Sequence, residues 1–291
     1  MNRRSVLSLP FLSVAPTQKA RGSNEPRKFR ISLGEWSLHK ALSRRLVSNL
    51  DFPRIAREQF GIEGLEFVNF LWEAPTADYV QRVKRAMAST ATKAVLIMCD
   101  GEGLMGHSVK EKRLQAAANH YKWVDIAAEL GAHGIRANMY AEKDPKTPAE
   151  IDAVLSYSAE SFRKLAEYAA ARKLNIVVEN HGGVSSDPVA MTRLMKMVNL
   201  PNFGTLPDFG NFGKDVDRYD AISKLLPYAK AVTFKCSDFK DGKETSIDMD
   251  RVMKSVIDSG YRNWIGIEYV GDRLTEYEGI QSAKAYLDRF I

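Results

Sequence analysis

The chain has 291 residues, of which 45% are hydrophobic and 27% are charged, a composition that suits a globular protein with a core of enzyme size. Its net charge of +6 comes from Lys and Arg residues dispersed among Glu and Asp, which argues against a clustered nucleic-acid-binding stripe. Two cysteines, Cys99 and Cys236, are too few for a disulfide framework or a cage of thiolates around a metal, and no run of about 18 apolar residues would span a membrane.

The first residues differ from the rest of the chain. Arg3 and Arg4 precede a short apolar stretch in MNRRSVLSLPFLSVAP, and the polar segment TQKARGSNEPRK follows. This order resembles a twin-arginine export signal, although Pro10 interrupts the apolar stretch. We therefore assign residues 1–27 to an export-signal-like or disordered N-terminal segment and residues 28–291 to one domain. The protein is expected to be exported to the periplasm if the segment acts as a signal, and to be cytoplasmic otherwise.

From Phe29 onward, short apolar runs alternate with segments in which apolar residues recur every three or four positions. Each unit spans about 20 to 40 residues without a hairpin signal, which is typical of right-handed βαβ repeats. Eight units in about 265 residues predict an α/β fold, a single (β/α)8 TIM barrel. A doubly wound open sheet is the alternative, but LGEWSLHK is not the glycine-rich phosphate turn expected after its first strand. The runs are FRISLGEW, IEGLEFVNF, KAVLIMCD, HGIRANMY, NIVVENH, FGTLPDFGN, AVTFKCSDF and WIGIEYVGD.

The fifth run carries two polar side chains where a buried strand should end. Glu179 and His181 are two residues apart, so in a strand both point to the same face as Val177. Active sites of (β/α)8 barrels lie at the carboxyl ends of the strands. The strand therefore directs two ligand-capable groups to the predicted mouth of the barrel, where Gly182 and Gly183 leave room beside them.

Acids in three other runs are further candidates. Asp208 lies at the tip of the sixth run, Glu268 lies within the eighth, and Glu66 lies between Leu65 and Phe67 in the second. A buried carboxylate costs several kcal/mol unless it is paired, hydrogen-bonded or bound to a metal. We expect these acids to converge with Glu179 at the mouth. The alternative is a polar network that fills the barrel. A carboxylate-rich site suits Mg or Mn, and also Zn if His181 joins it.

The motifs VVENHGG, DFGNF, FKCSDF and GIEYVGD follow one another at successive predicted strand ends. Together they resemble the xylose isomerase-like TIM-barrel superfamily over about residues 28–291, a group of sugar phosphate isomerases and epimerases, inosose dehydratases and an apurinic-site endonuclease. The resemblance implies that Glu179, Asp208 and Glu268 bind a divalent metal. It also implies that Glu179 and Glu268 form the acid–base pair.

Two positions depart from the pattern of the superfamily. Thr233 stands where many members have a metal-binding histidine, and Asn211 stands where relatives often have another histidine. Lys235 agrees with the pattern of the superfamily, and in a strand it points to the same face as Thr233. The metal site is therefore weaker, rebuilt with His181, or replaced by the ammonium group of Lys235.

Further candidates lie near the predicted mouth. Arg136, on the fourth run, would bind a substrate oxygen or pair with one of the acids, and Asn138 shares its face. Trp36 would stack on a sugar face or pack in the core. The predicted substrate-binding residues are Glu66, Arg136, Asn138, Asn211 and Trp36.

The predicted chemistry is proton abstraction next to the carbonyl of a small keto sugar or sugar derivative, assisted by a divalent metal. Glu179 or Glu268 would take the proton and the other would return it, while the metal or Lys235 polarises the oxygen, with His181 completing the catalytic set. A leaving group β to the carbonyl would turn the reaction into that of a lyase or dehydratase, acting on a keto sugar or keto glycoside. A non-catalytic sugar-binding barrel is another alternative. We expect no nucleotide cofactor and no nucleic-acid partner, and the oligomeric state is not predicted.

The N-terminal segment gives the first testable prediction. A fusion of residues 1–30 to a reporter is expected to be translocated, because paired arginines before an apolar stretch are read by the export machinery. A fusion with Arg3→Lys and Arg4→Lys is expected to stay inside the cell. Cell fractionation measures both, and retention of the unchanged fusion would show that the segment is only a tail.

Overall fold

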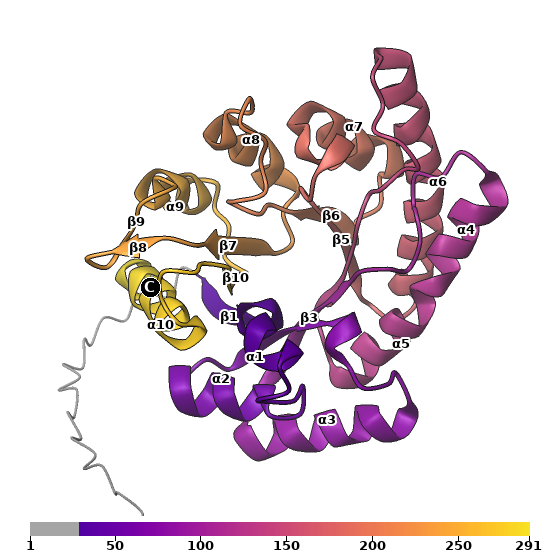
Figure 1. Cartoon of the computed structure of the whole chain (residues 1–291). Helices are drawn as coiled ribbons and strands as arrows, with labels where there is room; N and C mark the ends of the chain where they lie inside the picture. The colour runs from indigo at the N-terminus through magenta and orange to yellow at the C-terminus, as the bar shows by residue number, and fades with distance from the viewer. Residues whose placement is uncertain (1–28) are drawn as a thin grey trace, which may run out of the picture.

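A computed structural model describes residues 29–291, so the predicted export segment lies outside the described residues. Its centre is an eight-stranded parallel sheet curled into a barrel, in the order β6-β5-β4-β3-β2-β1-β10-β7 (Figure 1). Two isolated bridges, Thr205 with Ala229 and Asp208 with Thr233, link the ends of this order and nearly close the barrel. The predicted single (β/α)8 fold is confirmed. The barrel strands are β1 (Arg30–Gly34), β2 (Gly64–Val68), β3 (Lys93–Cys99), β4 (Gly134–Ala137), β5 (Asn175–Glu179), β6 (Phe203–Leu206), β7 (Val232–Cys236) and β10 (Trp264–Tyr269).

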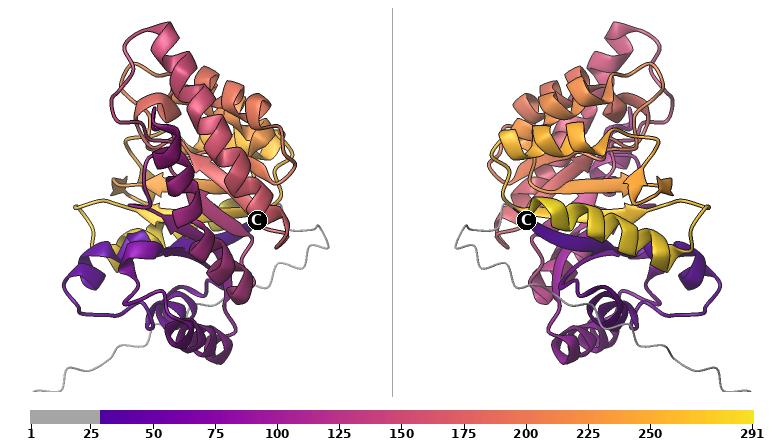
Figure 2. Two further views of the ribbon diagram at one scale, coloured as in Figure 1. Left: turned by 90° about the vertical axis from the view of Figure 1, so that its right-hand side faces the viewer. Right: turned by 90° about the vertical axis from the view of Figure 1, so that its left-hand side faces the viewer.

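Helices surround the barrel, as the side views in Figure 2 also show. Several begin at sequence signals: Thr147 and Thr275 each form a capping box with a Glu three residues later. No helix within residues 29–291 is long and apolar enough to cross a membrane. The α-helices are α1 (His39–Ser43), α2 (Phe52–Phe60), α3 (Ala77–Thr90), α4 (Lys110–Asn119), α5 (Tyr121–Leu130), α6 (Pro148–Ala170), α7 (Pro188–Val198), α8 (Arg218–Leu225), α9 (Met249–Asp258) and α10 (Glu276–Leu287). The 3-10 helices are η1 (Glu35–Leu38), η2 (Asn69–Leu71), η3 (Gly183–Ser186), η4 (Leu226–Tyr228) and η5 (Asp288–Phe290).

A short antiparallel hairpin follows β7, formed by β8 (Phe239–Lys240) and β9 (Lys243–Glu244). The expectation of no hairpin was wrong here. Asp241 and Gly242, at the turn, both have positive φ, of 50° and 74°. Asp-Gly is a favoured pair for such two-residue turns, so the sequence did carry the signal.

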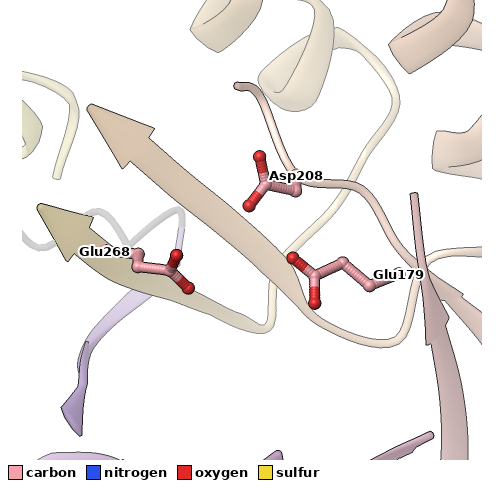
Figure 3. A group of neighbouring side chains, drawn as sticks. All are labelled: Glu179, Asp208 and Glu268. Carbon is pink, nitrogen blue, oxygen red and sulfur yellow. The ribbon is translucent and has the colours of Figure 1, made fainter. Parts of the chain in front are cut away.

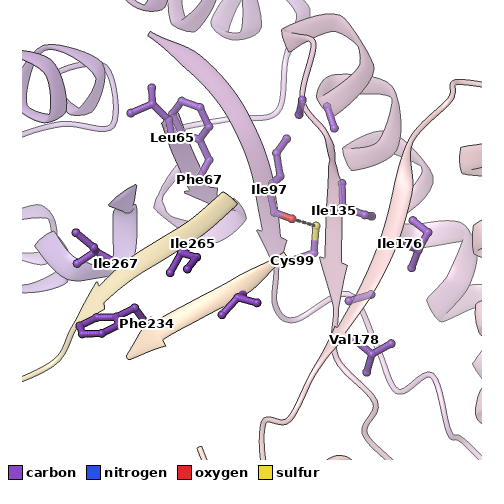
Figure 4. Packing of buried hydrophobic residues seen from close by; sticks show 14 of the residues in the cluster. Leu65, Phe67, Ile97, Cys99, Ile135, Ile176, Val178, Phe234, Ile265 and Ile267 are labelled. Atoms are coloured by element: carbon purple, nitrogen blue, oxygen red, sulfur yellow. Dashed lines mark hydrogen bonds between the residues drawn. The ribbon is translucent and has the colours of Figure 1, made fainter. Parts of the chain in front are cut away.

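Alternating strand residues separate two apolar regions. In β5, Ile176 and Val178 face the helices and belong to the large outer core, part of which Figure 4 shows. Val177 faces the barrel interior, as the predicted alternation requires. The interior cluster consists of Val68, Val95, Leu96, Met98, Val177, Leu206, Ala231 and Trp264.

Glu66 lies inside this interior and not at the mouth. Its side chain is fully buried, and its Oε1 accepts a hydrogen bond of 2.6 Å from Ser32 Oγ. A Cβ on Gly266 would lie 2.3 Å from Glu66 Oε2, so only a glycine leaves room for this carboxyl group. Burial raises the pKa of Glu66 to about 7, although the bond from Ser32 opposes the shift and the nearby Glu268 adds to it. The expected convergence of Glu66 with the other acids is therefore not found.

The raised pKa of Glu66 predicts a pH-dependent stability. Below about pH 4.5 the folded and unfolded chains both hold the proton; between about pH 4.5 and 7 only the folded chain does, so stability falls as pH rises. The loss of stability over this pH range amounts to about 3 kcal/mol. The variant Glu66→Gln has no proton to lose. The free energy of unfolding, measured by urea titration at pH 4 and at pH 8, should therefore decrease less in this variant than in the wild type. The difference between the two decreases should be about 3 kcal/mol.

The control is Glu63→Gln, a half-exposed acid just before β2 whose replacement should leave the pH dependence of the wild type unchanged. Parallel curves for the wild type and Glu66→Gln would show that Glu66 is ionised in the folded protein.

Candidate active site

Three carboxylates meet at the carboxyl end of the barrel (Figure 3). Glu179 ends β5, Asp208 follows β6 by two residues, and Glu268 lies one residue before the end of β10. Ligand oxygens of these three side chains lie within 4.8 Å of one another. The predicted convergence of these acids is confirmed. Within residues 29–291 this is the only such cluster of three or more His, Cys, Asp or Glu side chains, and His181 is not part of it.

Backbone geometry fixes the position of Asp208. Its Oδ1 accepts hydrogen bonds from the backbone N–H groups of Gly210 and Asn211, at 2.7 and 2.9 Å. Its backbone exchanges two further hydrogen bonds with the side chain of Asn180, the residue after β5. Burial raises the pKa of Asp208 well above its usual range. Lys235 opposes this shift, and the carboxylates of Glu179 and Glu268 add to it. Asp208 is thus rigidly held and prone to keep a proton.

Lys235 places a cation between two of these acids. It pairs with Glu268 in the β7–β10 register, and its Nζ lies 2.5 Å from Glu268 Oε1 and 3.4 Å from Asp208 Oδ2. Burial alone would lower the pKa of Lys235, but the carboxylates of Asp208, Glu268 and Glu179 together raise it. The ammonium group therefore stays charged. Thr233, two residues earlier, is fully buried.

A second cation approaches the cluster from β4. Arg136 Nε lies 3.0 Å from Glu179 Oε2, and Arg136 Nη1 lies 2.7 Å from Asp100 Oδ1. Asn138 Nδ2 donates to the same Asp100 oxygen, at 2.7 Å. Burial alone would raise the pKa of Asp100, but the Arg136 guanidinium has a larger effect in the opposite direction, so the pKa is lowered. Asp100 is therefore an ionised partner that holds Arg136 and Asn138 in place.

The pKa of Glu179 depends on both cations, Arg136 and Lys235. Burial raises its pKa and Glu268 adds to this shift, while Arg136 and Lys235 oppose it; the net direction is upward. Its Oε1 accepts a hydrogen bond of 3.0 Å from Asn211 Nδ2. The site thus brings carboxyl groups with raised pKa values beside cations, which is the arrangement that acid–base catalysis uses.

A cavity of about 210 Å³ opens above the cluster. Trp36 and Phe70 form an apolar wall, with ring centroids 5.6 Å apart and planes at 74°. On another side lies His181, whose Nδ1 is 2.5 Å from Tyr140 Oη. Burial lowers the pKa of His181, and the nearby Arg136 lowers it further, so the ring is neutral at pH 7. The cavity is lined by Trp36, Val68, Phe70, Met98, Asp100, Arg136, His181, Lys235 and Glu268.

The family model of the xylose isomerase-like TIM barrel matches residues 54–290. The chain belongs to this family. A search of curated proteins finds no match. Solved structures share the fold at low sequence identity.

Three of these structures are similar over almost their whole length. The apo form of 3-keto-D-glucoside 4-epimerase, YcjR, from E. coli has a TM-score of 0.69 and 17% identity, covering 91% of this chain and 100% of that chain. The probable 3-DHS dehydratase AsbF from Bacillus anthracis has a TM-score of 0.64 and 16% identity, covering 89% and 98%. The IOLI protein with a bound zinc atom has a TM-score of 0.71 and 14% identity, covering 90% and 99%.

In this xylose isomerase-like barrel, the expected substrate-binding residues separate into two groups. Trp36 and Arg136 line the cavity. Asn138 and Asn211 instead donate hydrogen bonds to the carboxylates of Asp100 and Glu179. For Arg136, the ion pair with acids is confirmed, and the side chain also lines the cavity. Its binding of a substrate oxygen stays a prediction.

Three residues at this mouth, Asp100, Phe70 and Tyr140, were not among the predicted site residues. Asp100 follows β3 in IMCD, so the rule that found the other strand-end acids also points to it. Phe70 and Tyr140 carry no comparable signal, because aromatic residues after strands are as often packed in the core.

Proposed function

We propose that the chain is a carbohydrate isomerase or epimerase that abstracts a proton next to the carbonyl of a small keto sugar or sugar derivative. The observation that carries the proposal is the cluster of Glu179, Asp208 and Glu268 within 4.8 Å, with Lys235 beside it. The cavity of about 210 Å³ is smaller than typical sites for drug-sized ligands and suits a molecule the size of one sugar.

Each group has a role in this reaction. Lys235 and Arg136 line the cavity and stabilise the negative charge that develops on the carbonyl oxygen when the neighbouring C–H bond breaks. Glu268 or Glu179 accepts that proton, and the other acid returns a proton to the resulting enediolate on a different carbon or a different face. Neutral His181 binds a substrate hydroxyl from the opposite wall.

The donor set at the mouth fits a divalent cation. Three carboxylates are hard oxygen ligands of the kind that Mg and Mn prefer. Glu179 Oε2 accepts no hydrogen bond among the described residues, although it forms an ion pair with Arg136 Nε at 3.0 Å. Glu179, Asp208 and Glu268 would hold the ion. When bound, such an ion polarises a carbonyl oxygen. The zinc atom in the IOLI structure supports a metal in this fold.

A second candidate function is that of a lyase or dehydratase on a keto sugar or keto glycoside. The same carbanion would expel a leaving group β to the carbonyl, and protonation of that group by the second acid would complete the elimination. The shared fold of the probable 3-DHS dehydratase favours keeping this candidate. NMR in D2O with a panel of keto sugars and keto glycosides separates the two: isomerases and epimerases add deuterium beside the carbonyl, whereas a lyase releases an alkene product.

The acid–base pair gives the central prediction. Glu179→Gln and Glu268→Gln should each lower kcat/KM by a factor of about 10² to 10⁴, because a carboxamide cannot accept or return the proton. Deuterium incorporation into the substrate should fall in parallel. The control is Glu167→Gln, an acid on α6 with a half-exposed side chain. Unchanged deuterium exchange in both site variants would contradict the proposal.

Lys235→Met separates a metal-assisted mechanism from one in which the lysine is the cation. If a metal is bound, turnover should fall while the metal content, measured by mass spectrometry, stays the same. If no metal is bound, the variant loses the charge that balances Glu179, Asp208 and Glu268. The pKa values of Glu179 and Asp208 then rise further, and folding should be destabilised by about 3 kcal/mol at neutral pH. Acidification should restore part of this stability, since protonation removes the repulsion.

The matched control is Lys224→Met, which removes an exposed pair with Asp220 and should change stability by no more than about 0.5 kcal/mol. If Lys235→Met has normal activity and the same melting temperature as the wild type at every pH, both versions of the mechanism are wrong.

A further inference from the structure

A second, larger cavity adjoins the mouth on the same face of the barrel. This groove has a volume of about 870 Å³ and lies between residues 42–51, in the connection after β1, and residues 70–73, after β2. Phe70 lines both the groove and the mouth. The loops that follow barrel strands form the binding face of such folds, so the groove is a continuation of the candidate active site.

The groove exposes large apolar side chains. Leu46 is 72% exposed and Phe70 is 54% exposed, and no other large apolar side chain within residues 29–291 is more exposed than Leu46. Leu42, Val47 and Leu71 line the same groove. Apolar side chains gathered at a cleft mark a surface that binds a ligand.

Four polar residues of the groove are already occupied by one another, while Ser43, Arg45 and Glu73 also line it. Ser48 Oγ donates to Asp51 Oδ2 at 2.7 Å, and Tyr79 Oη donates to Asn49 Oδ1 at 3.1 Å. Asn49 Nδ2 in turn donates to the buried Glu35, at 2.6 Å. These four residues have few groups left to bind sugar hydroxyls, and the exposed Leu46 and Phe70 favour an apolar ligand over a second sugar ring.

The same network makes the groove rigid. Glu35, at the start of η1, accepts a hydrogen bond from Asn49 on one oxygen and from the backbone N–H of Val68, the last residue of β2, on the other. It therefore joins the loop after β1 to the neighbouring strand. A binding surface that is already ordered loses less conformational entropy when a ligand binds.

We propose that this groove binds the apolar aglycone of a glycoside whose sugar ring occupies the mouth. This inference rests on the proposed function, and it specifies the substrate class as glycosides with an aromatic or aliphatic aglycone. Phe70 lies where the two cavities meet and would contact the aglycone next to the glycosidic oxygen. Leu46 would cover its far end.

Calorimetric titration of the purified protein tests the groove without turnover. The probes are phenyl and methyl D-glucopyranosides and D-galactopyranosides, each as both anomers. In at least one pair the phenyl glycoside should bind about tenfold tighter than the methyl glycoside, because the phenyl ring buries apolar area in the groove. In Leu46→Ser and Phe70→Ala this advantage should fall below about threefold.

The control is Val189→Ser, because Val189 is as exposed as Phe70 but lies on α7, away from the groove. It should keep the full advantage. Equal binding in every pair, no binding of any probe, an advantage that survives both groove variants, or tighter binding of cellobiose than of phenyl glucoside would each overturn the proposal. A phenyl advantage in a protein without deuterium exchange would reject the proposed reaction and leave the groove assignment standing.

Discussion

The ion pairs of Lys235 and Arg136 with buried acids are the constraint on which the mouth of this barrel depends. Glu179, Asp208 and Glu268 are all at least 95% buried, and isolated carboxylates in that environment would cost several kcal/mol each. Two cations, from β7 and β4, offset part of this cost. The sheet register sets the first pair, because Lys235 and Glu268 are direct partners on neighbouring strands. The remaining imbalance favours a proton on Asp208, whose pKa burial raises.

The barrel interior shows two different ways of burying an acid. Glu66 has no cation beside it and avoids the cost of burial by staying protonated at mildly acidic pH. Glu179 lies close to Arg136 and Lys235, so it can hold a charge and still have a raised affinity for a proton. The cations stabilise the ionised form of Glu179, while burial and Glu268 favour its protonated form, so both states are accessible for proton transfer. The position of the cations therefore separates the catalytic candidates from the structural acid.

The sequence predicted the eight strands, the alternation of Val177 with Ile176, and the three converging acids, because strand periodicity and strand-end position decide all of these. Depth within the barrel was not predictable in the same way. Strand β1 lies between the strands of the two acids. Glu66 is the register partner of Gly34 in β1, and Ile267, the residue before Glu268, is the partner of Leu33, the residue before Gly34. Glu66 and Glu268 therefore lie at nearly the same level of the hydrogen-bond register. Strands in such a barrel tilt by about 36°, and two strand spacings of about 4.8 Å then separate the acids by roughly 6 Å in depth. Likewise, the linear sequence does not show that Asn138 and Asn211 turn toward acids.

Chemistry and substrate choice lie on different parts of the chain. The proposed reacting groups project from β4, β5, β7 and β10 or follow β6 directly, where sheet hydrogen bonds fix their positions. The apolar wall of Trp36 and Phe70 and the adjoining groove come from the short helices and loops after β1 and β2. Loops accept changes in length and composition that strands do not, so a barrel can keep one acid–base arrangement while its substrates differ. In this chain Glu35 joins the two parts, since it fixes the groove to the end of β2 beside the mouth.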